Sequence, residues 1–307
     1  MVALVFGQSN AANAGVGRGR GGPGVYNFYA GGLYEAQDPL LGATGGGGSV
    51  WTRLGPELLR QGDYDAVVFA PVAVGGSALA EWTVGGRLHP RLLEAVAELN
   101  RADLLPTHLL WHQGETDNRA GTGGGAYREM FLAMLGSLRD RGVRAPVYVS
   151  VATRCGASGP NEALRAAQRG LVDAARNIRP GPDTDALGPE SRSDGCHFSE
   201  NGLERYADLW LEALSVPYPK APQTLRFDLA GLRKTAADPA FSVRPFAEAG
   251  SGLPVRFTGL SPLVCRVSAD GLVTPLGAGR CTLLAGQGGD AFYAAARTLE
   301  AAFTVTP

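Results

Sequence analysis

The chain has 307 residues, of which 45% are hydrophobic and 19% are charged, a composition typical of a globular protein with a sizeable core. Its formal net charge of −1 creates no field of one sign that would draw it to nucleic acid or to an anionic membrane. No apolar run approaches the roughly 20 residues that span a bilayer. We therefore expect neither nucleic-acid binding nor membrane insertion. The length predicts about two domains, and the sequence leaves the oligomeric state open.

The N-terminal segment is the most informative part of the chain. An apolar run, Val2–Phe6, starts directly after Met1 and ends at Gly7, and Ser9 follows two residues later. This pattern predicts a buried first strand with a serine at its carboxyl end, although a turn or a helix cap is the alternative for such a serine. Because a buried strand cannot also be a cleaved leader, we expect the sequence to begin at the mature domain of an exported protein.

Strand-like and helix-like segments alternate up to about residue 218 and predict a doubly wound α/β fold with a parallel sheet. The strands are short, continuous apolar runs, as expected when both faces are buried: Val2–Phe6, Ala66–Val74, Thr107–Trp111 and Val147–Ala152. The helices show apolar residues three and four positions apart: Trp51–Arg60, Pro90–Leu99, Gly125–Arg141, Asn161–Asn177 and Ser199–Ser215. Ligands bind outside the carboxyl ends of such strands, where Ser9, Gly75, Gln113 and Cys155 all fall.

The character of the chain changes after Pro217. A proline-rich segment, 216–222, is typical of a semi-rigid linker. Beyond it, short β-prone segments are separated by turn signals and predict an all-β sandwich: Thr224–Asp228, Ser242–Pro245, Leu253–Thr258, Val264–Ser268, Gly271–Pro275, Gly279–Gly286 and Arg297–Val305. We therefore expect two domains, 1–217 and 218–307.

A second polar segment, Asp194-Gly195-Cys196-His197, lies just before the last predicted helix. A serine hydroxyl needs a base within hydrogen-bond reach, and the base needs an orienting partner. His197 suits the role of base because an unperturbed imidazole has a pKa of about 6.5. Asp194 is close enough in sequence to contact the His197 ring from the same loop. These residues predict a hydrolytic triad of Ser9, His197 and Asp194, with a solvated turn as the alternative for the loop.

Acyl transfer also needs hydrogen-bond donors for the developing oxyanion. We expect the Ser9 N–H as the first donor and an N–H of Gly75 or Gly76, just past the second strand, as the second. The third candidate is the carboxamide of Gln113, in His112-Gln113-Gly114-Glu115. A plain turn at the two glycines, and a loop hydrogen bond for Gln113, are the structural alternatives.

Together these segments resemble the ordered blocks of the SGNH hydrolase superfamily: Gly7-Gln8-Ser9-Asn10, Gly75-Gly76, His112-Gln113-Gly114-Glu115 and Asp194-Gly195-Cys196-His197-Phe198. They are most similar to its sialate O-acetylesterase and acetylxylan esterase branch, over roughly residues 2–215. The resemblance implies a three-layer, flavodoxin-like α/β/α fold and a serine esterase that acts on acetylated carbohydrate without a cofactor. It implies the triad and oxyanion roles given above. Cys196 departs from the general pattern. The histidines lack metal-ligand spacing, so we expect no metal.

Four cysteines are present. Cys155 follows the fourth predicted strand, on the same sheet edge as Cys196, and we predict a disulfide between them; two buried thiols are the alternative. The C-terminal segment resembles bacterial immunoglobulin-like modules, which implies a pairing of Cys265 with Cys281 on neighbouring strands. Disulfides persist in oxidising compartments, so we expect a secreted, periplasmic or cell-surface protein.

Substrate contacts are less specific. Trp82 is the best candidate for stacking on a sugar ring, with core packing as the alternative, and Asn10 and Glu115 are candidates for polar contacts. For Glu115 a structural hydrogen bond is the alternative. Two rival functions remain open: a short-chain carboxylesterase without sugar preference, and a glycan-binding surface protein whose esterase domain is vestigial. The sequence identifies neither the natural ester nor the role of the C-terminal domain.

Overall fold

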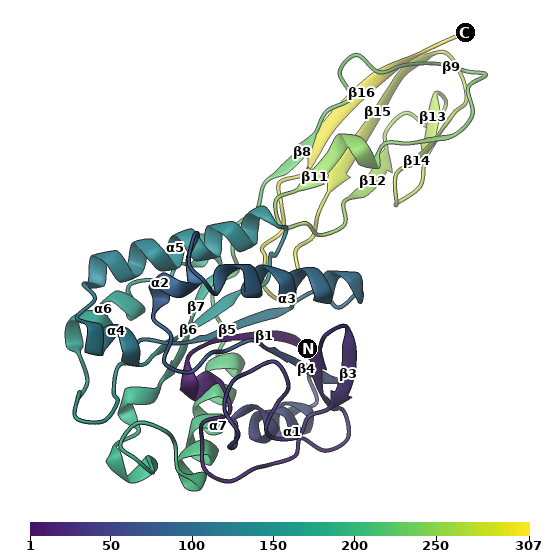
Figure 1. The fold of residues 1–307 in the computed structure, drawn as a ribbon. Coiled ribbons are helices and arrows are strands. Elements are labelled where there is room, and N and C mark those ends of the chain that lie inside the picture. The colour runs from purple at the N-terminus through teal and green to yellow at the C-terminus, as the bar shows by residue number, and fades with distance from the viewer. The chain divides into compact units, whose positions relative to one another are not determined.

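A computed structural model describes residues 1–307. The chain divides into two compact units, Met1–Tyr218 and Pro219–Pro307, each built around hydrophobic cores of its own. Figure 1 shows the first unit as a sheet with helices and the second as strands alone apart from one short turn. No helix is long and apolar enough to cross a membrane.

A seven-stranded sheet forms the middle of the first unit, in the order β3-β2-β4-β1-β5-β6-β7. Its strands are β1 (Val2–Gly7), β2 (Val25–Tyr29), β3 (Gly32–Glu35), β4 (Val67–Pro71), β5 (His108–His112), β6 (Val147–Val151) and β7 (Ile178–Asp183). Every neighbouring pair is parallel except β2 with β3. The five strands from β4 to β7 have the flavodoxin-like order 2-1-3-4-5, which confirms the predicted α/β class and adds an antiparallel edge strand.

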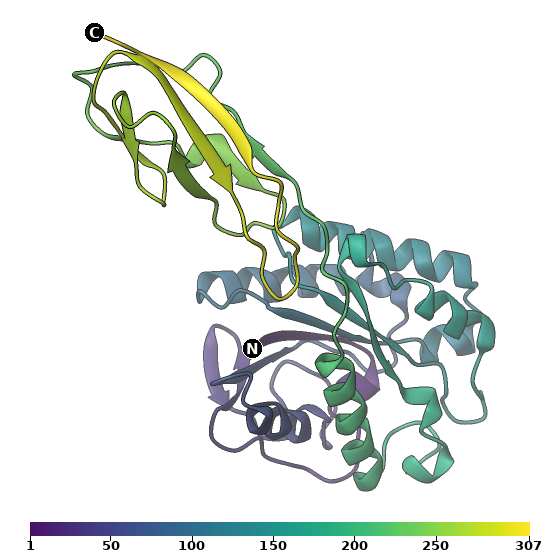
Figure 2. The same ribbon diagram turned by 180° about the vertical axis from the view of Figure 1, so that it is seen from behind.

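Helices cover both faces of this sheet (Figures 1 and 2). Their bounds are α1 (Trp51–Gln61), α2 (Leu79–Trp82), α3 (His89–Arg101), α4 (Glu115–Ala120), α5 (Gly124–Asp140), α6 (Glu162–Arg169) and α7 (Glu200–Ser215). One core lies between the sheet and α1 and α7, and the other between the sheet and α2, α3, α5 and α6. Alternate residues of β1 serve both cores: Leu4 and Phe6 pack in one, and Ala3 and Val5 in the other. This explains the continuous apolar run, because neither face meets water.

The predicted fourth helix, Asn161–Asn177, was too long. Its N-cap is Asn161, whose side chain accepts the Leu164 N–H, but the helix ends at Arg169. A 3₁₀ turn, Ala174–Arg176, follows, and Asn177 adopts a left-handed φ of 54°. The chain then enters β7, a strand that the sequence did not predict because Pro180 and Pro182 disfavour strands. They are tolerated because β7 is an edge strand, where an N–H is dispensable.

The hairpin of β2 and β3 was also not predicted. It lies between two glycine-rich stretches, 15–24 and 45–48, where the sequence analysis predicted no element. Only its pairing with β4 joins this short segment to the sheet. The hairpin extends the sheet beyond β4.

The second unit contains three small sheets: β12-β15-β16-β9, β10-β14-β13 and β11-β8. Its strands are β8 (Leu225–Phe227), β9 (Arg233–Thr235), β10 (Phe241–Ser242), β11 (Ala247–Ala249), β12 (Arg256–Gly259), β13 (Cys265–Val267), β14 (Leu272–Pro275), β15 (Gly279–Gly286) and β16 (Leu299–Thr306). The disulfide Cys265–Cys281 joins β13 to β15. These strands belong to different sheets, so the pair is as expected but the expectation of neighbouring strands was wrong: the bond crosses the core between sheets.

Candidate active site

Ser9 is positioned by the close approach of β1 and β5, which pair in parallel up to Gly7 and His112. Gly7 has a φ of +126°, and a Cβ at this position would lie 2.0 Å from the His112 carbonyl oxygen, so only glycine fits. The Gln8 N–H donates to the same carbonyl at 3.0 Å. The chain then forms a 3₁₀ turn, Ser9–Ala11. Ser9 therefore lies at the carboxyl ends of β1 and β5, the point where the strand order reverses and where ligands bind in this topology.

The loop before α7 brings an imidazole to Ser9. His197 Nε2 lies 3.0 Å from Ser9 Oγ, across 188 residues of sequence. On the other side of the ring, His197 Nδ1 lies 2.7 Å from Asp194 Oδ2. The second oxygen of Asp194 accepts the N–H groups of Cys196 and His197 at 2.9 and 2.7 Å. Serine, histidine and aspartate thus form one continuous hydrogen-bonded chain.

The protonation states follow from this geometry. Desolvation acts to raise the pKa of Asp194, but the hydrogen bonds from His197 and Cys196 outweigh it and lower the pKa to about 2. An ionised carboxylate only accepts hydrogen bonds, so His197 Nδ1 carries the proton that it donates to Asp194. Nε2 of the neutral ring is then the acceptor, and it faces the Ser9 hydroxyl. This is the arrangement that a general base requires.

Several covalent and polar contacts hold the His197 loop. Cys155, past β6, is joined to Cys196 by a disulfide, the pair that the sequence predicted. The Gly156 N–H donates to the Gly195 carbonyl at 3.0 Å. From beneath, the buried Arg192 guanidinium donates to the Cys196 carbonyl at 2.5 Å and to the Thr184 carbonyl at 2.8 Å. The segment directly before His197 is therefore tied to the loops that follow β6 and β7.

A second, buried network lies behind Ser9. Glu115 Oε1 accepts the Asn10 carboxamide N–H at 2.8 Å and lies 3.0 Å from His112 Nε2. His112 Nδ1 lies 2.6 Å from the Tyr206 hydroxyl. Burial acts to raise the pKa of Glu115, but the charge and hydrogen bond of His112 and the hydrogen bond of Asn10 lower it to about 2. Glu115 Oε2 is buried without a partner.

This network corrects the expectation that Asn10 and Glu115 contact substrate. Their residues are only 4% and 1% exposed, and the hydrogen bonds that their side chains form are to groups inside the protein. Asn10 also donates to the Cys196 carbonyl at 3.3 Å. It therefore connects the segment that carries Ser9 with the loop that carries His197.

Two backbone N–H groups are available as oxyanion donors. Those of Ser9 and Gly76 have no acceptor in the protein. The Gly75 N–H, in contrast, donates to the Thr44 hydroxyl at 2.7 Å. A Cβ built on Gly75 would lie 3.7 Å from Ser9 Cβ and 3.4 Å from Thr44 Oγ1, so these residues lie side by side. The sequence analysis missed Thr44, because nothing in its glycine-rich loop marks it.

The Gln113 carboxamide, which we expected to be the third oxyanion donor, forms its hydrogen bonds inside the protein. Its side chain is fully buried, and Nε2 donates to Asp117 Oδ2 and, at 3.1 Å, to the Ser77 carbonyl. Both N–H groups therefore serve the protein itself in this structure, and Gln113 connects α4 to the segment that follows Gly76. Gln113 therefore helps to hold the segments around Ser9 in place, and its side chain directs no N–H group towards the Ser9 hydroxyl.

The expectation that Trp82 stacks on sugar was wrong. Trp82 is fully buried, packs on Phe6 and Trp111, and donates its indole N–H to Ser77 Oγ at 2.8 Å. It belongs to the core beneath the site. Nor does any group of three or more histidine, cysteine or acidic side chains have an arrangement that could hold a metal ion.

This fold and this site define the class as a flavodoxin-like α/β protein that carries a hydrogen-bonded serine, histidine and aspartate at the carboxyl edge of its sheet. Two solved structures with a similar fold are a protein from Arabidopsis thaliana, at 21% identity with a TM-score of 0.56, and NanS, at 17% identity with a TM-score of 0.52. The first alignment covers 70% of this chain and 97% of that one, and the second covers 69% and 95%. A comparison with curated proteins finds no match.

Within that class the family is shown by a match over residues 1–214 to the model described as "Carbohydrate esterase, sialic acid-specific acetylesterase". The chain belongs to this family and is a carboxylic ester hydrolase. The match ends close to the end of α7 and leaves the second unit outside it.

Proposed function

We propose that the protein removes O-acetyl groups from carbohydrate with Ser9 as nucleophile, His197 as general base and Asp194 as the residue that orients it. The observation that carries this proposal is the pair of contacts on opposite sides of one imidazole. Nε2 lies 3.0 Å from Ser9 Oγ and Nδ1 lies 2.7 Å from an ionised carboxylate. The family description supports acetylated carbohydrate as the substrate class and names sialic acid; acetylated xylan is the second candidate that the sequence resemblance implies.

The reaction has two steps of acyl transfer. Ser9 Oγ forms a bond to the acetyl carbonyl carbon while its proton passes to His197 Nε2. The tetrahedral intermediate collapses, the bond to the sugar oxygen breaks, and His197 returns the proton to that oxygen. Water then attacks the acetyl-enzyme, again giving its proton to His197, and acetate leaves as Ser9 recovers its proton. Asp194 stays ionised throughout and stabilises the imidazolium form.

The negative oxygen of the intermediate needs donors already in place. We assign this role to the N–H groups of Ser9 and Gly76, which have no acceptor in the protein. The Thr44 hydroxyl is a third donor in the proposal. Its oxygen already accepts the Gly75 N–H, which leaves the hydroxyl proton available for another acceptor, and Gly75 lies beside Ser9. Thr44 thus takes the third position that the sequence analysis gave to Gln113.

The two disulfides support a location in an oxidising compartment, outside the cytosol. For the domain organisation, we propose an esterase domain, 1–217, and an immunoglobulin-like domain, 218–307, which the small antiparallel sheets and the disulfide across their core support.

The direct test is hydrolysis of p-nitrophenyl acetate by Ser9→Ala. We expect turnover to fall by about 10⁵-fold or more, with an unchanged circular dichroism spectrum and melting temperature, because Ser9 contributes little buried area. Acetate release from acetylated xylan and from acetylated sialic acid then identifies the carbohydrate class. Turnover close to that of the wild type would refute the role of Ser9.

A further inference from the structure

A cavity of about 200 Å³ opens beside α3, where β2 and β4 end. Tyr29 and Pro71, the last residues of these strands, line it together with Gly42 from the loop that follows the hairpin. Because β2 and β4 are parallel, the cavity lies at the same edge of the sheet as Ser9. It is separate from the triad and contains none of its residues.

The backbone segment 71–75 leads from this cavity to Ser9. After Pro71 the chain stays extended, since the N–H groups of Val72 and Val74 donate to β1 at 2.8 and 3.0 Å. Four residues of extended chain, from Pro71 to Gly75, span about 13 Å, and Gly75 lies beside Ser9. The loop that carries Gly42 runs alongside, because the Thr44 N–H donates to the Ala73 carbonyl at 3.0 Å. A substrate that extends beyond one sugar ring can therefore reach both places.

The lining has the chemistry that a sugar ring needs. Phe28, Val72 and Ala95 are buried and form an apolar wall. Tyr29 is 46% exposed, and its ring lies 3.2 Å from the position that a Cβ on Gly42 would occupy. One side of this aromatic ring is thus supported by backbone while the rest faces solvent. An apolar surface with a few polar groups at its rim is typical of small-molecule sites.

The polar groups at the rim carry no excess positive charge. The Arg91 guanidinium donates to the carbonyls of Gly42 and Val72, which ties α3 to the loop. Glu94 is paired with Arg101 at 2.6 Å, and Glu98 adds a second carboxylate to the lining. A sugar carboxylate would meet at least as much negative as positive charge here. The hydroxyl groups of a neutral sugar, in contrast, can bond to either kind of side chain.

We propose that this cavity is a subsite for an uncharged sugar ring of the substrate, on the alcohol side of the ester, with Tyr29 as the stacking residue. The inference rests on the proposed function, which it deepens by naming the substrate class. A cavity of about 200 Å³ equals the liquid volume of about seven water molecules, which suits one ring rather than several.

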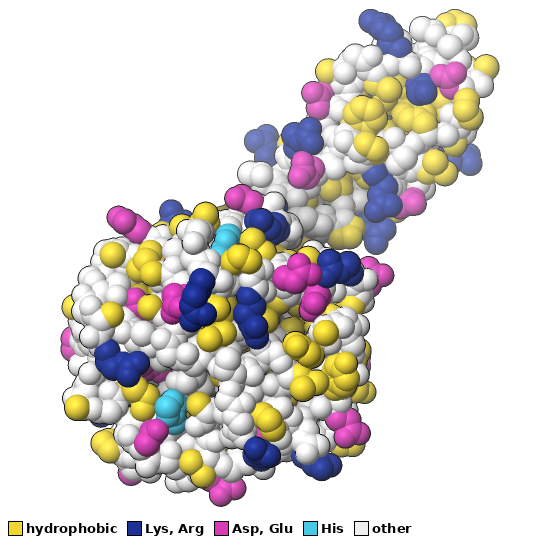
Figure 3. All heavy atoms as spheres, viewed as in Figure 1, with side chains coloured by type: hydrophobic (Ala, Val, Ile, Leu, Met, Phe, Trp, Pro, Cys, Tyr) yellow, Lys and Arg dark blue, Asp and Glu magenta, His cyan; other side chains and the backbone are white.

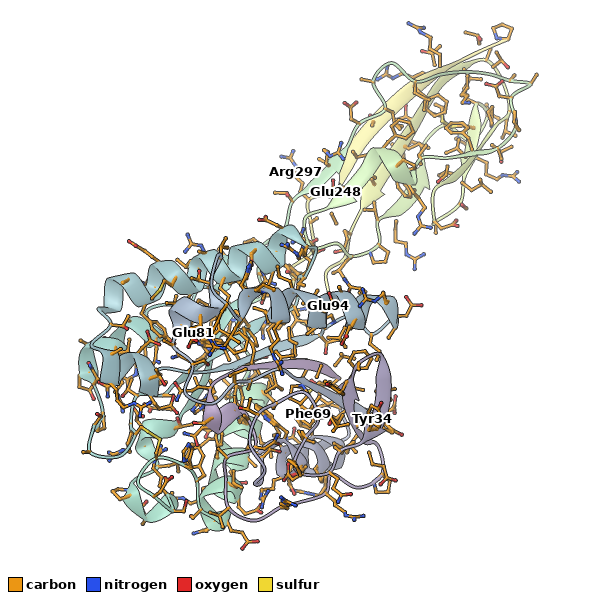
Figure 4. The ribbon with its side chains drawn as sticks, in the orientation of Figure 1. Tyr34, Phe69, Glu81, Glu94, Glu248 and Arg297 are labelled. Atoms are coloured by element: carbon orange, nitrogen blue, oxygen red, sulfur yellow. A yellow bond between two sulfur atoms is a disulfide. The ribbon has the colours of Figure 1, made fainter.

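The exposed hydrophobic side chains around the cavity could instead bind a second copy of the chain. Leu33, Tyr34 and Leu41 are 43 to 51% exposed near Tyr29. Figure 3 shows hydrophobic side chains over β3 and charged side chains of both signs over α3, and Figure 4 places Tyr34 on the outer strand and Glu94 on α3. A second copy of the chain would use the hairpin as a whole. The cavity and its charged rim favour a saccharide, because an interface between copies would need neither.

Tyr34 provides a matched control. It is as exposed as Tyr29, at 46%, and lies on the same hairpin, but it does not line the cavity. In full-length protein carrying Ser9→Ala, we expect Tyr29→Ala to weaken binding of unacetylated xylo-oligosaccharide by about tenfold, the upper range for one aromatic contact. Tyr34→Ala should leave the affinity unchanged. Calorimetry measures both without any turnover.

Turnover gives the second readout. In the Ser9-containing enzyme, Tyr29→Ala should raise KM for acetylated xylo-oligosaccharide by a similar factor and leave p-nitrophenyl acetate hydrolysis unchanged, since that ester has no sugar. Equal effects of the two tyrosine variants, no effect of either, or a dimer in sedimentation that both variants dissociate would overturn the subsite. So would competition by N-acetylneuraminate as strong as that of the neutral oligosaccharide. If the wild type hydrolyses no ester but the binding contrast holds, the esterase proposal fails and the cavity remains only as a site that binds a neutral sugar.

Discussion

The site contains two carboxylate–imidazole pairs with the same spacing in sequence, and they differ in almost every other respect. Asp194 and His197 are three residues apart, as are His112 and Glu115. Both pairs lie where β-strands end, close to Ser9. In the first pair the side chains are 55% and 31% exposed, and in the second each is 1% exposed.

The two pairs differ most in the hydrogen-bond partners of the two imidazole nitrogens. His197 gives Nδ1 to Asp194 and keeps Nε2 for Ser9. His112 gives Nε2 to Glu115 and Nδ1 to Tyr206, and all three groups are buried. An imidazole with both nitrogens occupied away from solvent has no position left for a proton from substrate. An imidazole and a carboxylate therefore leave one ring nitrogen facing Ser9 in the first pair and form a closed, buried network in the second, and the surroundings decide which.

The largest effect expected to distinguish the two pairs is on activity. Asp194→Asn keeps the size of the side chain but removes the charge that selects the His197 tautomer. By analogy with the same change in a serine protease triad, we expect kcat to fall by about 10⁴-fold. The measurement is p-nitrophenyl acetate hydrolysis at pH 7 with thermal unfolding as the check on the fold. A loss below tenfold would mean that Asp194 does not orient the base.

The next effect concerns stability. Glu115→Gln removes the charge from the buried pair, and we expect the free energy of unfolding at pH 7 to drop by about 3 kcal/mol. The pKa of Glu115 is lowered from 4.5 to about 2 in the folded protein. Its stabilising contribution is therefore complete above pH 4.5 and is lost as the pH falls towards 2.

Urea unfolding of wild type and Glu115→Gln at pH 7 and again at pH 3 measures this dependence. The difference in the free energy of unfolding between wild type and Glu115→Gln should be smaller at pH 3 than at pH 7. Asp194→Asn is the control, because its exposed carboxylate should change stability much less than Glu115. A gap that stays constant or widens on acidification would contradict a charged Glu115 in the folded state.

The smallest effect tests the connection between the pairs. Asn10 donates both to Glu115 Oε1 and to the Cys196 carbonyl, at 2.8 and 3.3 Å. Asn10→Ala should lower kcat by about tenfold, the effect of losing one charge-assisted hydrogen bond. In a double-mutant cycle with Glu115→Gln, the losses in kcat should be less than additive, since Glu115→Gln already removes the charge to which Asn10 donates. Strict additivity would show that the scaffold and the catalytic loop are not coupled through Asn10.

Much of the fold could be predicted because its signals are local. The four predicted strands that are buried on both faces were visible in the sequence as apolar runs. The two helices predicted from Asn161 and Ser199 begin there in the structure, where these residues are the N-caps. Where long-range pairing overrides local preference, the prediction failed. β7 holds Pro180 and Pro182 and forms a strand only because β6 offers it a partner.

The site divides in the same way. Ser9, Asp194 and His197 were predicted from their residue types and their places at strand and loop ends. The burial of Trp82, Asn10 and Glu115 was not predictable, because a side chain's exposure depends on the neighbours that pack around it. Thr44 could not be found either, since its loop has no pattern that links it to Gly75.

The sequence by itself determined which residue types follow the strands, and with them the class of chemistry, because chemical identity and strand periodicity are local properties of the chain. Only the tertiary structure decided which imidazole keeps a nitrogen for a serine hydroxyl, which imidazole has both nitrogens bonded inside the protein, and which aromatic ring faces water. Those properties depend on solvent exposure and on hydrogen-bond partners brought together from more than a hundred residues away.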